Sequence, residues 1–297
     1  MNNLIKNILM TPFNILYKVS PKMELELLFY LRKGYRLNLK NPRTYNEKLQ
    51  WIKLYDKNPL MEKCCDKYHV RKYLKELHCE ELLVKLIWEG YNPEDIPFDE
   101  LPEKCVIKAT HGSTFNIICK DVKKVVKQDV IKTCKRWLKE KFLPCYGEWF
   151  YGRMKPRIII EEYLENLDGS SLNDYKVYCF NGEPRYIKVD IDRFSNHKCN
   201  IYSVNWKKIE NVRIGFNNAC VEVSKPECLE ELLQYARLLS KQFLHARVDF
   251  YIVDGKIYFG EITFTSGAGF SNIQPYEFDV EMGNCLSLKK IEYEKNK

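Results

Sequence analysis

Two neighbouring segments near the end of the chain decide its fold: Ala246-Arg247-Val248-Asp249-Phe250 and Gly260-Glu261-Ile262-Thr263-Phe264. Both alternate apolar and polar side chains, and the tight Asp254-Gly255 turn between them predicts a β-hairpin. Alternation puts Glu261 and Thr263 on one face, and the hairpin brings Asp249 beside them with Arg247 on the same side. Two carboxylates, a neutral oxygen ligand and an arginine suit a magnesium-bound polyphosphate. We therefore predict a metal site at Asp249, Glu261 and Thr263.

The composition is that of an ordinary globular enzyme. The 297 residues are 45% hydrophobic and 30% charged, which argues against a disordered or fibrous chain. The net charge is +8, and the basic residues are scattered rather than gathered in blocks. A solvated basic surface is the simplest interpretation, and attraction to a polyanionic substrate or an anionic membrane is the sharper alternative. We expect no nucleic-acid partner, and the sequence does not predict an oligomeric state.

The twelve cysteines indicate free thiols in a reducing compartment. They fall within apolar runs, such as those around Cys105 and Cys179, or on helix-like segments, and no C-x-x-C pair occurs. The five histidines show no spacing typical of a zinc site. The cysteine pattern therefore favours an intracellular protein without disulfides.

The start of the chain bears on its location. Residues 1–10 lack the long uncharged core and the cleavage site of a signal peptide, and no apolar stretch is long enough to cross a bilayer. The segment from Leu4 onward could lie on the inner face of a membrane as a basic amphipathic helix. Packing against the protein's own body is the favoured alternative. We expect a cytoplasmic protein, with membrane contact left open.

The first hundred residues predict helices. Residues 14–31 have roughly helical spacing, interrupted at Pro21. The capping box Thr44-x-x-Glu47 begins a second helix. Asn58-Pro59 begins a third, which reaches Leu77. We therefore expect a helical N-terminal region over residues 1–100.

From residue 101 the pattern changes to strands. Residues 106–109 and 116–119 predict a hairpin whose tip carries Gly112 and Ser113 and is preceded by Lys108. The lysine and the backbone N–H groups of the tip could clamp phosphates, although an ordinary surface hairpin has the same pattern. A basic helix is expected over residues 122–142. A buried strand over residues 157–164 follows, and we expect these elements to form one subdomain over residues 101–165.

Two glutamates, Glu161 and Glu162, end the buried strand. They could receive the amino group and the ribose hydroxyls of a nucleotide, or they are simply exposed charges. The polar loop of residues 166–173 is the expected seam with a second subdomain over residues 166–297. That half contains strands over residues 174–181 and 184–192 around the Asn181-Gly182 turn, and a helix opened by Pro226.

A D-x-D pattern supports a second hypothesis. Asp190-Ile191-Asp192 has the spacing that holds a metal and a nucleotide-sugar in many glycosyltransferases, and both aspartates are expected on one strand face. Lys176, Arg193 and Lys198 supply positive charge beside it. The pattern also arises by chance, which is the favoured interpretation. A glycosyltransferase of surface polysaccharide synthesis is the runner-up function, and a kinase-like use of ATP is a third.

Several longer phrases resemble one known family. These are N-E-K-L-Q-W-x-K-L-Y-D-x-N-P-L, D-K-Y-x-V-R-K-Y, K-A-T-H-G-S, I-I-x-E-E-Y-L, D-Y-K-V-Y-C-F-N-G, D-R-F-S-N-H-K-x-N and G-E-I-T-F. Their order resembles the ATP-grasp superfamily and, more narrowly, the TupA-like ATP-grasp family of bacterial surface-polymer biosynthesis. The resemblance runs from about residue 37 to residue 270. It implies an α+β ATP-grasp fold, in which two α+β subdomains enclose ATP, with a helical N-terminal extension.

The resemblance also implies roles for individual residues. The expected phosphate contacts are Lys67 and Lys108, with the Gly112-Ser113 turn as a flap and Lys198 as a further lysine. The expected adenine hinge is Glu161, Glu162 and Leu164, and Asp174 and Lys176 are expected near the ribose and phosphates. Arg247 and Lys108 are the expected catalytic residues, and Asp249, Glu261 and Thr263 the expected Mg²⁺ ligands. Thr263 stands where the superfamily usually has Asn, and the flap lacks a second Gly.

The function that this resemblance implies is an ATP-dependent carboxylate–amine ligase. Such an enzyme forms an amide through an acylphosphate, with ATP and Mg²⁺ in the site. The expected partners are an amino acid and a uronic acid, or a growing peptide, in a capsule or wall polymer such as a teichuronopeptide. We predict that Arg193, Asn196 and His197 recognise a carboxylate, because a guanidinium binds carboxylate through two bonds.

Overall fold

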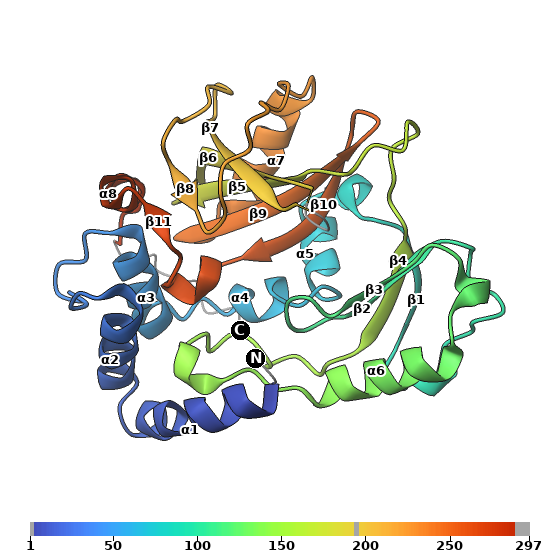
Figure 1. The fold of residues 1–297 in the computed structure, drawn as a ribbon, viewed down its shortest axis with the longest axis horizontal. Coiled ribbons are helices and arrows are strands. Elements are labelled where there is room, and N and C mark those ends of the chain that lie inside the picture. The colour runs from blue at the N-terminus through green and yellow to red at the C-terminus, as the bar shows by residue number, and fades with distance from the viewer. Residues whose placement is uncertain (1–2, 193–195, 289–297) are drawn as a thin grey trace.

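Two antiparallel sheets organise the chain, and helices from both ends of the sequence cover them (Figure 1). The computed structural model describes residues 3–192 and 196–288. The four-stranded sheet has the order β1-β4-β2-β3, with β1 at Leu86–Gly90, β2 at Cys105–Ala109, β3 at Asn116–Cys119 and β4 at Ile158–Glu162. The five-stranded sheet has the order β10-β9-β5-β6-β7, with β5 at Asp174–Phe180, β6 at Glu183–Ile191, β7 at Lys198–Ser203, β9 at His245–Val253 and β10 at Lys256–Thr263.

The β9–β10 hairpin forms as the sequence predicts. Asp254 and Gly255 both have positive φ, 48° and 82°, which suits the tight turn between twisted strands. A bulge at Gly260 shifts the register, so that Glu261 lies opposite Asp249 and Thr263 opposite Arg247. A Cβ at Gly260 would lie 3.0 Å from the Asp249 carbonyl oxygen. The bulge therefore brings the two carboxylates face to face.

The N-terminal helices agree with the sequence prediction only in part. They are α1 Asn3–Val19, α2 Pro21–Lys33, α3 Tyr45–Tyr55, α4 Leu60–Cys64 and α5 Val70–Glu76. Pro21 begins α2, and the predicted capping box of Thr44 and Glu47 begins α3. The expected single helix from Asn58 to Leu77 is wrong. The Asp66 carboxylate accepts hydrogen bonds from the backbone N–H groups of Tyr68 and His69, and this local pairing breaks the helix between α4 and α5.

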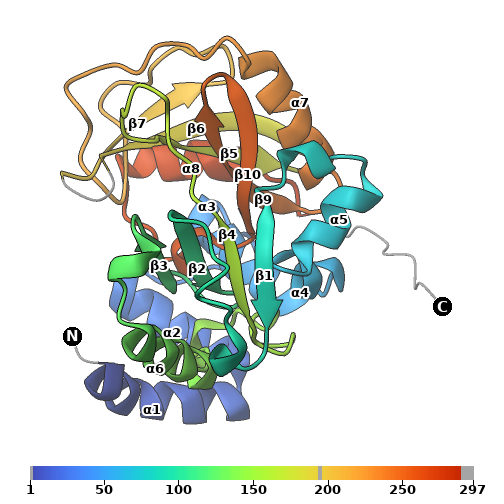
Figure 2. The same cartoon turned by 90° about the vertical axis from the view of Figure 1, so that its right-hand side faces the viewer.

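The predicted boundary at residue 100 does not match the edge of a sheet. β1 pairs with β4, so the four-stranded sheet begins at Leu86, inside the region expected to be helical. Helix α6, Lys127–Lys139, packs Val130, Cys134 and Trp137 against this sheet (Figure 2). It is shorter than the predicted span of 122–142, because residues 122–124 form a separate 3₁₀ turn.

Both ends of the sequence contribute to one core on the five-stranded sheet. Tyr45 of α3 packs against Tyr178 and Phe180 of β5 and His245 of β9, and α3 also contacts helix α8, Tyr276–Asn284. Helix α7, Leu229–Ser240, covers the opposite face, where Cys179 contacts the carbonyl of Ala236. A small ribbon of β8, Arg213–Ile214, and β11, Ile273–Gln274, lies beside α8. The face that carries Arg247 and Asp249 is therefore bordered by α3 and the segment after β10.

The cysteine prediction is confirmed: all twelve are free thiols, and eight of them are buried. Among the described residues, no helix has the length and apolar character that a bilayer crossing requires.

Candidate ATP and metal site

Arg247 stands at the centre of the β9–β10 face. Its Nε and Nη2 atoms donate to the two carboxylate oxygens of Asp249, each at 2.7 Å. Nη2 also lies 3.3 Å from Glu261 Oε1 and 3.0 Å from Thr263 Oγ1. Thr263 in turn donates to Glu261 Oε1 at 3.3 Å. One cation thus contacts the oxygen atoms of all three predicted metal ligands.

The burial of this group makes its charges interact strongly. Burial by itself would raise the pKa of Asp249, but the Arg247 guanidinium and the Lys176 ammonium outweigh it and hold that pKa below its usual value. Burial would likewise lower the pKa of Arg247, and Asp249 reverses the effect and raises it well above normal. Both groups are therefore charged over the whole physiological pH range.

The donor set fits a magnesium ion that phosphate oxygens complete. Within the described ranges, no three His, Cys, Asp or Glu side chains gather as a metal cluster. Asp249 and Glu261 could supply two carboxylates and Thr263 a hydroxyl. Mg²⁺ in nucleotide sites is bound by one or two carboxylates together with substrate phosphates. The position of the Arg247 guanidinium shows that these oxygens already accommodate positive charge.

A lysine joins this cluster to its neighbour on the same sheet face. Lys176 Nζ lies 2.8 Å from Asp174, 3.3 Å from Asp190 and 3.3 Å from Asp249. The strand register explains the contacts, because Lys176 pairs with Asp249 on one side and Asp174 with Asp190 on the other. Burial would lower the pKa of Lys176, but Asp249 and Asp174 more than compensate, and the pKa is raised. The predicted pair Asp174 and Lys176 thus extends the metal-side cluster.

The structure places only one of the three residues predicted to recognise substrate in the charged cluster. His197 joins the cluster, with Nε2 3.2 Å from Asp190 Oδ1 and its ring 3.7 Å from the ring centre of Phe216. Asn196 is exposed at the start of the described segment. Arg193 lies outside the described residues, so its predicted role stays a prediction.

Two sequence expectations on β6 and β7 differ from the structure. Asp190 and Asp192 do not share a strand face: β6 ends at Ile191, and Asp192 turns away with a φ of 50° and is exposed. Asp190 instead pairs with Lys188 at 2.9 Å and with Lys176. Lys198 pairs with Ile191 in the register, so the pleat directs it to the sheet face opposite Asp190.

A second group of predicted residues lies on the four-stranded sheet. Lys108 Nζ lies 2.7 Å from Glu161 Oε2, and Arg71 Nη1 lies 3.0 Å from Glu161 Oε1. Glu161 is therefore buried between two cations rather than exposed at a strand end. Glu162 is exposed, and Leu164 follows the strand in a partly buried position.

The turn between β2 and β3 is tied to the helical region. Lys67 Nζ donates to the carbonyl of Gly112 at 2.8 Å, and the Lys67 backbone N–H donates to the carbonyl of Thr110. Gly112 has a φ of 84°, and a Cβ there would lie 2.7 Å from the Phe115 ring. Ser113 is exposed at the tip. Lys67 therefore contacts the predicted flap directly.

The sequence interpretation missed a loop directly after β10. Gly267, Ala268 and Gly269 all have positive φ, between 54° and 70°, in a 3₁₀ turn at Ser266–Gly269. Arg247 Nη1 lies 3.4 Å from Ser266 Oγ, so the turn borders the predicted metal site. The signal was the small-residue stretch Ser266-Gly267-Ala268-Gly269 after the metal-ligand strand.

Helix α3 holds this loop in place. Gln50 Nε2 donates to the Gly269 carbonyl at 2.7 Å, and Lys53 Nζ donates to the Ala268 carbonyl at 2.8 Å. Lys53 is buried, and burial lowers its pKa to about 8, while Glu148 and Glu24 oppose the shift. A left-handed Ala costs roughly 1 kcal/mol of backbone strain, which these bonds offset.

Comparison with solved structures finds several ligases with low sequence identity. D-alanine–D-alanine ligase from Bacillus anthracis is 20% identical, with a TM-score of 0.42 over 75% of this chain and 66% of that protein. Its ATP complex matches 68% of this chain and 55% of that protein, with a TM-score of 0.41 and 19% identity. D-cycloserine synthetase DcsG is 12% identical, with a TM-score of 0.42 over 76% and 70%. Phosphoribosylamine–glycine ligase from Thermotoga maritima is 13% identical, with a TM-score of 0.43 over 69% and 48%.

The chain covers 55% of the length of the D-alanine–D-alanine ligase in its ATP complex. No curated protein matches the sequence. The TupA-like ATP-grasp family model matches residues 47–287, which is most of the chain. The expected α+β ATP-grasp fold is thereby confirmed, and the chain belongs to the TupA-like ATP-grasp family.

Proposed function

We propose that this protein is an ATP-dependent carboxylate–amine ligase. The observation that carries the proposal is the contact of Arg247 with Asp249, Glu261 and Thr263 on paired strands, in a chain of an ATP-grasp family. A site that binds a polyphosphate together with Mg²⁺ needs carboxylates for the metal and a guanidinium for the phosphate oxygens, and these residues supply both.

In this proposal Asp249 and Glu261, with the Thr263 hydroxyl, hold Mg²⁺. The ion, when bound, neutralises the phosphate charge. Arg247 and Lys108 are the catalytic residues, and Lys67 supports the flap through Gly112. These cations stabilise the charge on the transferring phosphoryl oxygens, since positioning and electrostatics are most of what phosphoryl transfer requires.

The nucleotide would lie between the two sheets. Glu161, Glu162 and Leu164 at the end of β4 are the proposed adenine hinge, and Lys108 and Arg71 fix the Glu161 side chain. Asp174 and Lys176 are proposed near the ribose and phosphates, next to the metal side of the site. Lys198 is the weakest member of the set, because its strand position directs it to the other sheet face.

The proposed reaction has two steps that balance in atoms and charge. A substrate carboxylate oxygen attacks the γ-phosphorus of ATP, and the bond to the β-γ bridging oxygen breaks to give an acylphosphate and ADP. An amine nitrogen then attacks the acyl carbon, loses a proton, and expels inorganic phosphate to leave an amide. The Ser266–Gly269 turn beside Arg247 is the proposed edge of the acyl-acceptor site.

The proposed substrates are an amino acid and a uronic acid or peptide of a bacterial surface polysaccharide. His197, with Asn196 and Arg193, would recognise a carboxylate of one of them. The proposal includes a cytoplasmic location. A capsule or teichuronopeptide is the class of polymer concerned, as the family resemblance implies.

The test is product formation by the purified protein. With ATP, Mg²⁺ and a panel of uronic acids and amino acids, the productive pair should release ADP and phosphate in equal amounts. Mass spectrometry of the product should show a loss of water between the partners. Glu261→Gln should abolish turnover, and the matched control Asp192→Asn should retain it. No turnover with any pair, together with no ATP binding, would contradict the proposal.

The same experiment separates the two other hypotheses. A kinase-like enzyme would transfer phosphate to the acceptor and release no free phosphate. A glycosyltransferase would depend on Asp192, although Asp190 is buried among lysines and Asp192 lies just past the end of β6. No specific contact in the described residues favours either one.

A further inference from the structure

The helices at the start of the chain carry an unusual share of the exposed apolar surface. Among the described residues, seven of the sixteen exposed large hydrophobic side chains lie within residues 9–31. Single exposed hydrophobic residues are normal, but a cluster of this kind marks an interaction site. The members are Leu9, Ile15, Val19, Met23, Leu27, Tyr30 and Leu31, which we name the apolar stripe.

The side chains of the apolar stripe are not the ones that pack helix α1 against the rest of the protein. Helix α1 packs Met10, Phe13 and Tyr17 against α2 and the segment around Cys145. The side chain of Asn14 accepts a hydrogen bond from the Cys145 backbone N–H on the same side. Packing on the protein's own body, favoured from the sequence, therefore accounts for one face of α1 and leaves the other apolar and exposed.

The spacing makes the exposed side chains into continuous lines. On α2, Met23, Leu27 and Leu31 follow one another every four residues, which is one line along a helix. On α1, Ile15 and Val19 have the same spacing, and Val19 ends beside the start of α2. Both helices therefore carry an exposed apolar line, and Val19 and Met23 lie on either side of their junction at Ser20.

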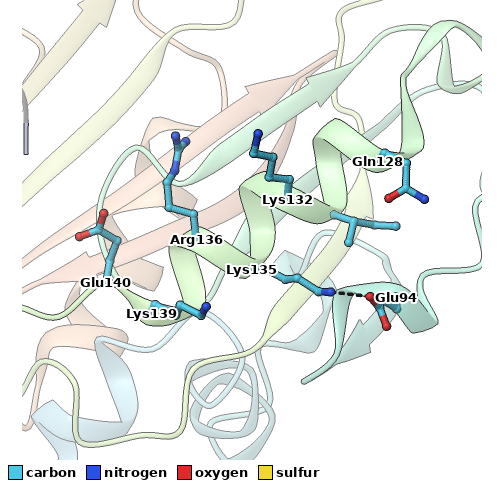
Figure 3. A pocket seen from close by; sticks show the side chains of 8 residues that line it. Glu94, Gln128, Lys132, Lys135, Arg136, Lys139 and Glu140 are labelled. Atoms are coloured by element: carbon cyan, nitrogen blue, oxygen red, sulfur yellow. Dashed lines mark hydrogen bonds and ion pairs between the residues drawn. The ribbon is translucent and has the colours of Figure 1, made fainter.

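Basic side chains flank the stripe. Lys18, Lys22 and Arg32 are exposed on the same two helices, and Glu26 is their acidic neighbour. Helix α6 adds Lys127, Lys132, Lys135, Arg136 and Lys139 against Asp129. Both views place α1 and α6 along the lower edge of the molecule (Figures 1 and 2). Figure 3 shows Lys132 and Arg136 on one side of α6 and Lys135 and Lys139 on the other. Lys127 is paired with Asp99 and Lys135 with Glu94, whereas Lys132, Arg136 and Lys139 have no ion pair within the described residues.

We propose that the apolar stripe and the basic side chains of α6 together bind the surface of an anionic lipid bilayer. Apolar side chains would enter the boundary between headgroups and acyl chains, and the cations would meet anionic headgroups. The positive charge beside the apolar stripe argues against a second copy of this chain as the partner that covers it. A two-fold contact through the stripe would bring like-charged flanks together, and such contacts are repulsive.

This inference does not rest on the proposed ligase activity, because the surface is built from α1, α2 and α6 and contains none of the proposed catalytic or metal residues. The failure of one leaves the other standing.

The test is sedimentation of the full-length protein with vesicles. Vesicles that contain phosphatidylglycerol should bind it, and vesicles of phosphatidylcholine alone should bind it weakly. The double variants Ile15→Asp/Val19→Asp and Lys132→Glu/Arg136→Glu should each weaken binding by roughly tenfold or more. Val221→Asp is the matched control, because Val221 is 75% exposed and Val19 78% but Val221 lies in another part of the chain. It should bind like the parent protein.

Two results would overturn the proposal. One is equal binding of the parent and both double variants, each shown by circular dichroism to be folded. The other is absence of vesicle binding together with a dimer in light scattering that Ile15→Asp/Val19→Asp converts to a monomer. The second result would identify the stripe as a contact between copies of the chain.

Discussion

Replacement of Arg247 by methionine should strengthen the binding of free Mg²⁺ and abolish turnover at the same time. The guanidinium makes two bonds of 2.7 Å to Asp249 and also contacts Glu261 and Thr263, so a metal can reach these oxygens only by displacing it. Hydrogen bonds to charged groups contribute about 1.5–3 kcal/mol each. Screening is small, because the Arg247 side chain is only 14% exposed.

The size of the effect follows from these bonds. Loss of the two bonds to Asp249 amounts to about 3 kcal/mol at the low end, and about 1.4 kcal/mol corresponds to a factor of ten in affinity. Since the carboxylates recover part of this by relaxing and by binding water, we expect a gain of roughly tenfold to a hundredfold in Mg²⁺ affinity without nucleotide. The variant also leaves the buried Asp249 carboxylate with Lys176 as its remaining cation, which should lower the free energy of unfolding by about 3 kcal/mol in metal-free buffer.

The assay is a Mg²⁺ titration followed by thermal unfolding and by calorimetry, without nucleotide. Arg247→Met should gain stability steeply with added Mg²⁺, whereas the parent protein should respond weakly. Lys188→Met is the matched control, because it removes a buried cation that pairs with Asp190 and contacts none of the metal ligands. A folded Arg247→Met variant with unchanged or weaker Mg²⁺ binding would refute the idea that the guanidinium and the metal compete.

Three further predictions concern stability and the loop after β10. Burial raises the pKa of Glu24 to about 8, against the lowering effect of Lys53. The free energy of unfolding should therefore fall as the pH rises from 4.5 to 8, because the folded state keeps a proton that the unfolded state loses. Glu24→Gln should remove this fall, which urea unfolding at pH 4.5 and pH 8 would measure. Gly283→Ala should cost about 3 kcal/mol or more, because its Cβ would lie 2.1 Å from the Arg43 carbonyl oxygen, and a near-normal urea midpoint would contradict this. Lys53→Met removes a bond to the Ala268 carbonyl and should speed hydrogen exchange in residues 266–270; unchanged exchange would show that α3 does not hold the loop.

The elements that could be predicted from the sequence are those set by residues a few positions apart in the chain. The β9–β10 hairpin is set by alternation and by the Asp254-Gly255 turn, and the α3 cap by Thr44 and Glu47. Both depend on residues a few positions apart. The predicted convergence of Asp249, Glu261 and Thr263 follows from the same local rules.

The features that the sequence did not predict depend on distant partners. β1 becomes a strand by pairing with β4, some seventy positions later in the chain. The left-handed Ala268 is held by Gln50 and Lys53 of a helix more than two hundred residues earlier. The interruption between α4 and α5 arises because the Asp66 side chain competes for backbone N–H groups, which helical periodicity does not reveal.

The central claim is that the β9–β10 face holds the metal end of an ATP site, and calorimetric binding of ATP tests it most directly. The parent protein should bind ATP in the presence of Mg²⁺ and much less in its absence. Glu261→Gln should fold normally, because this side chain is 39% exposed, and should lose tenfold or more in MgATP affinity. Asp192→Asn should bind like the parent protein. Equal MgATP affinity of Glu261→Gln and the parent protein would contradict the account.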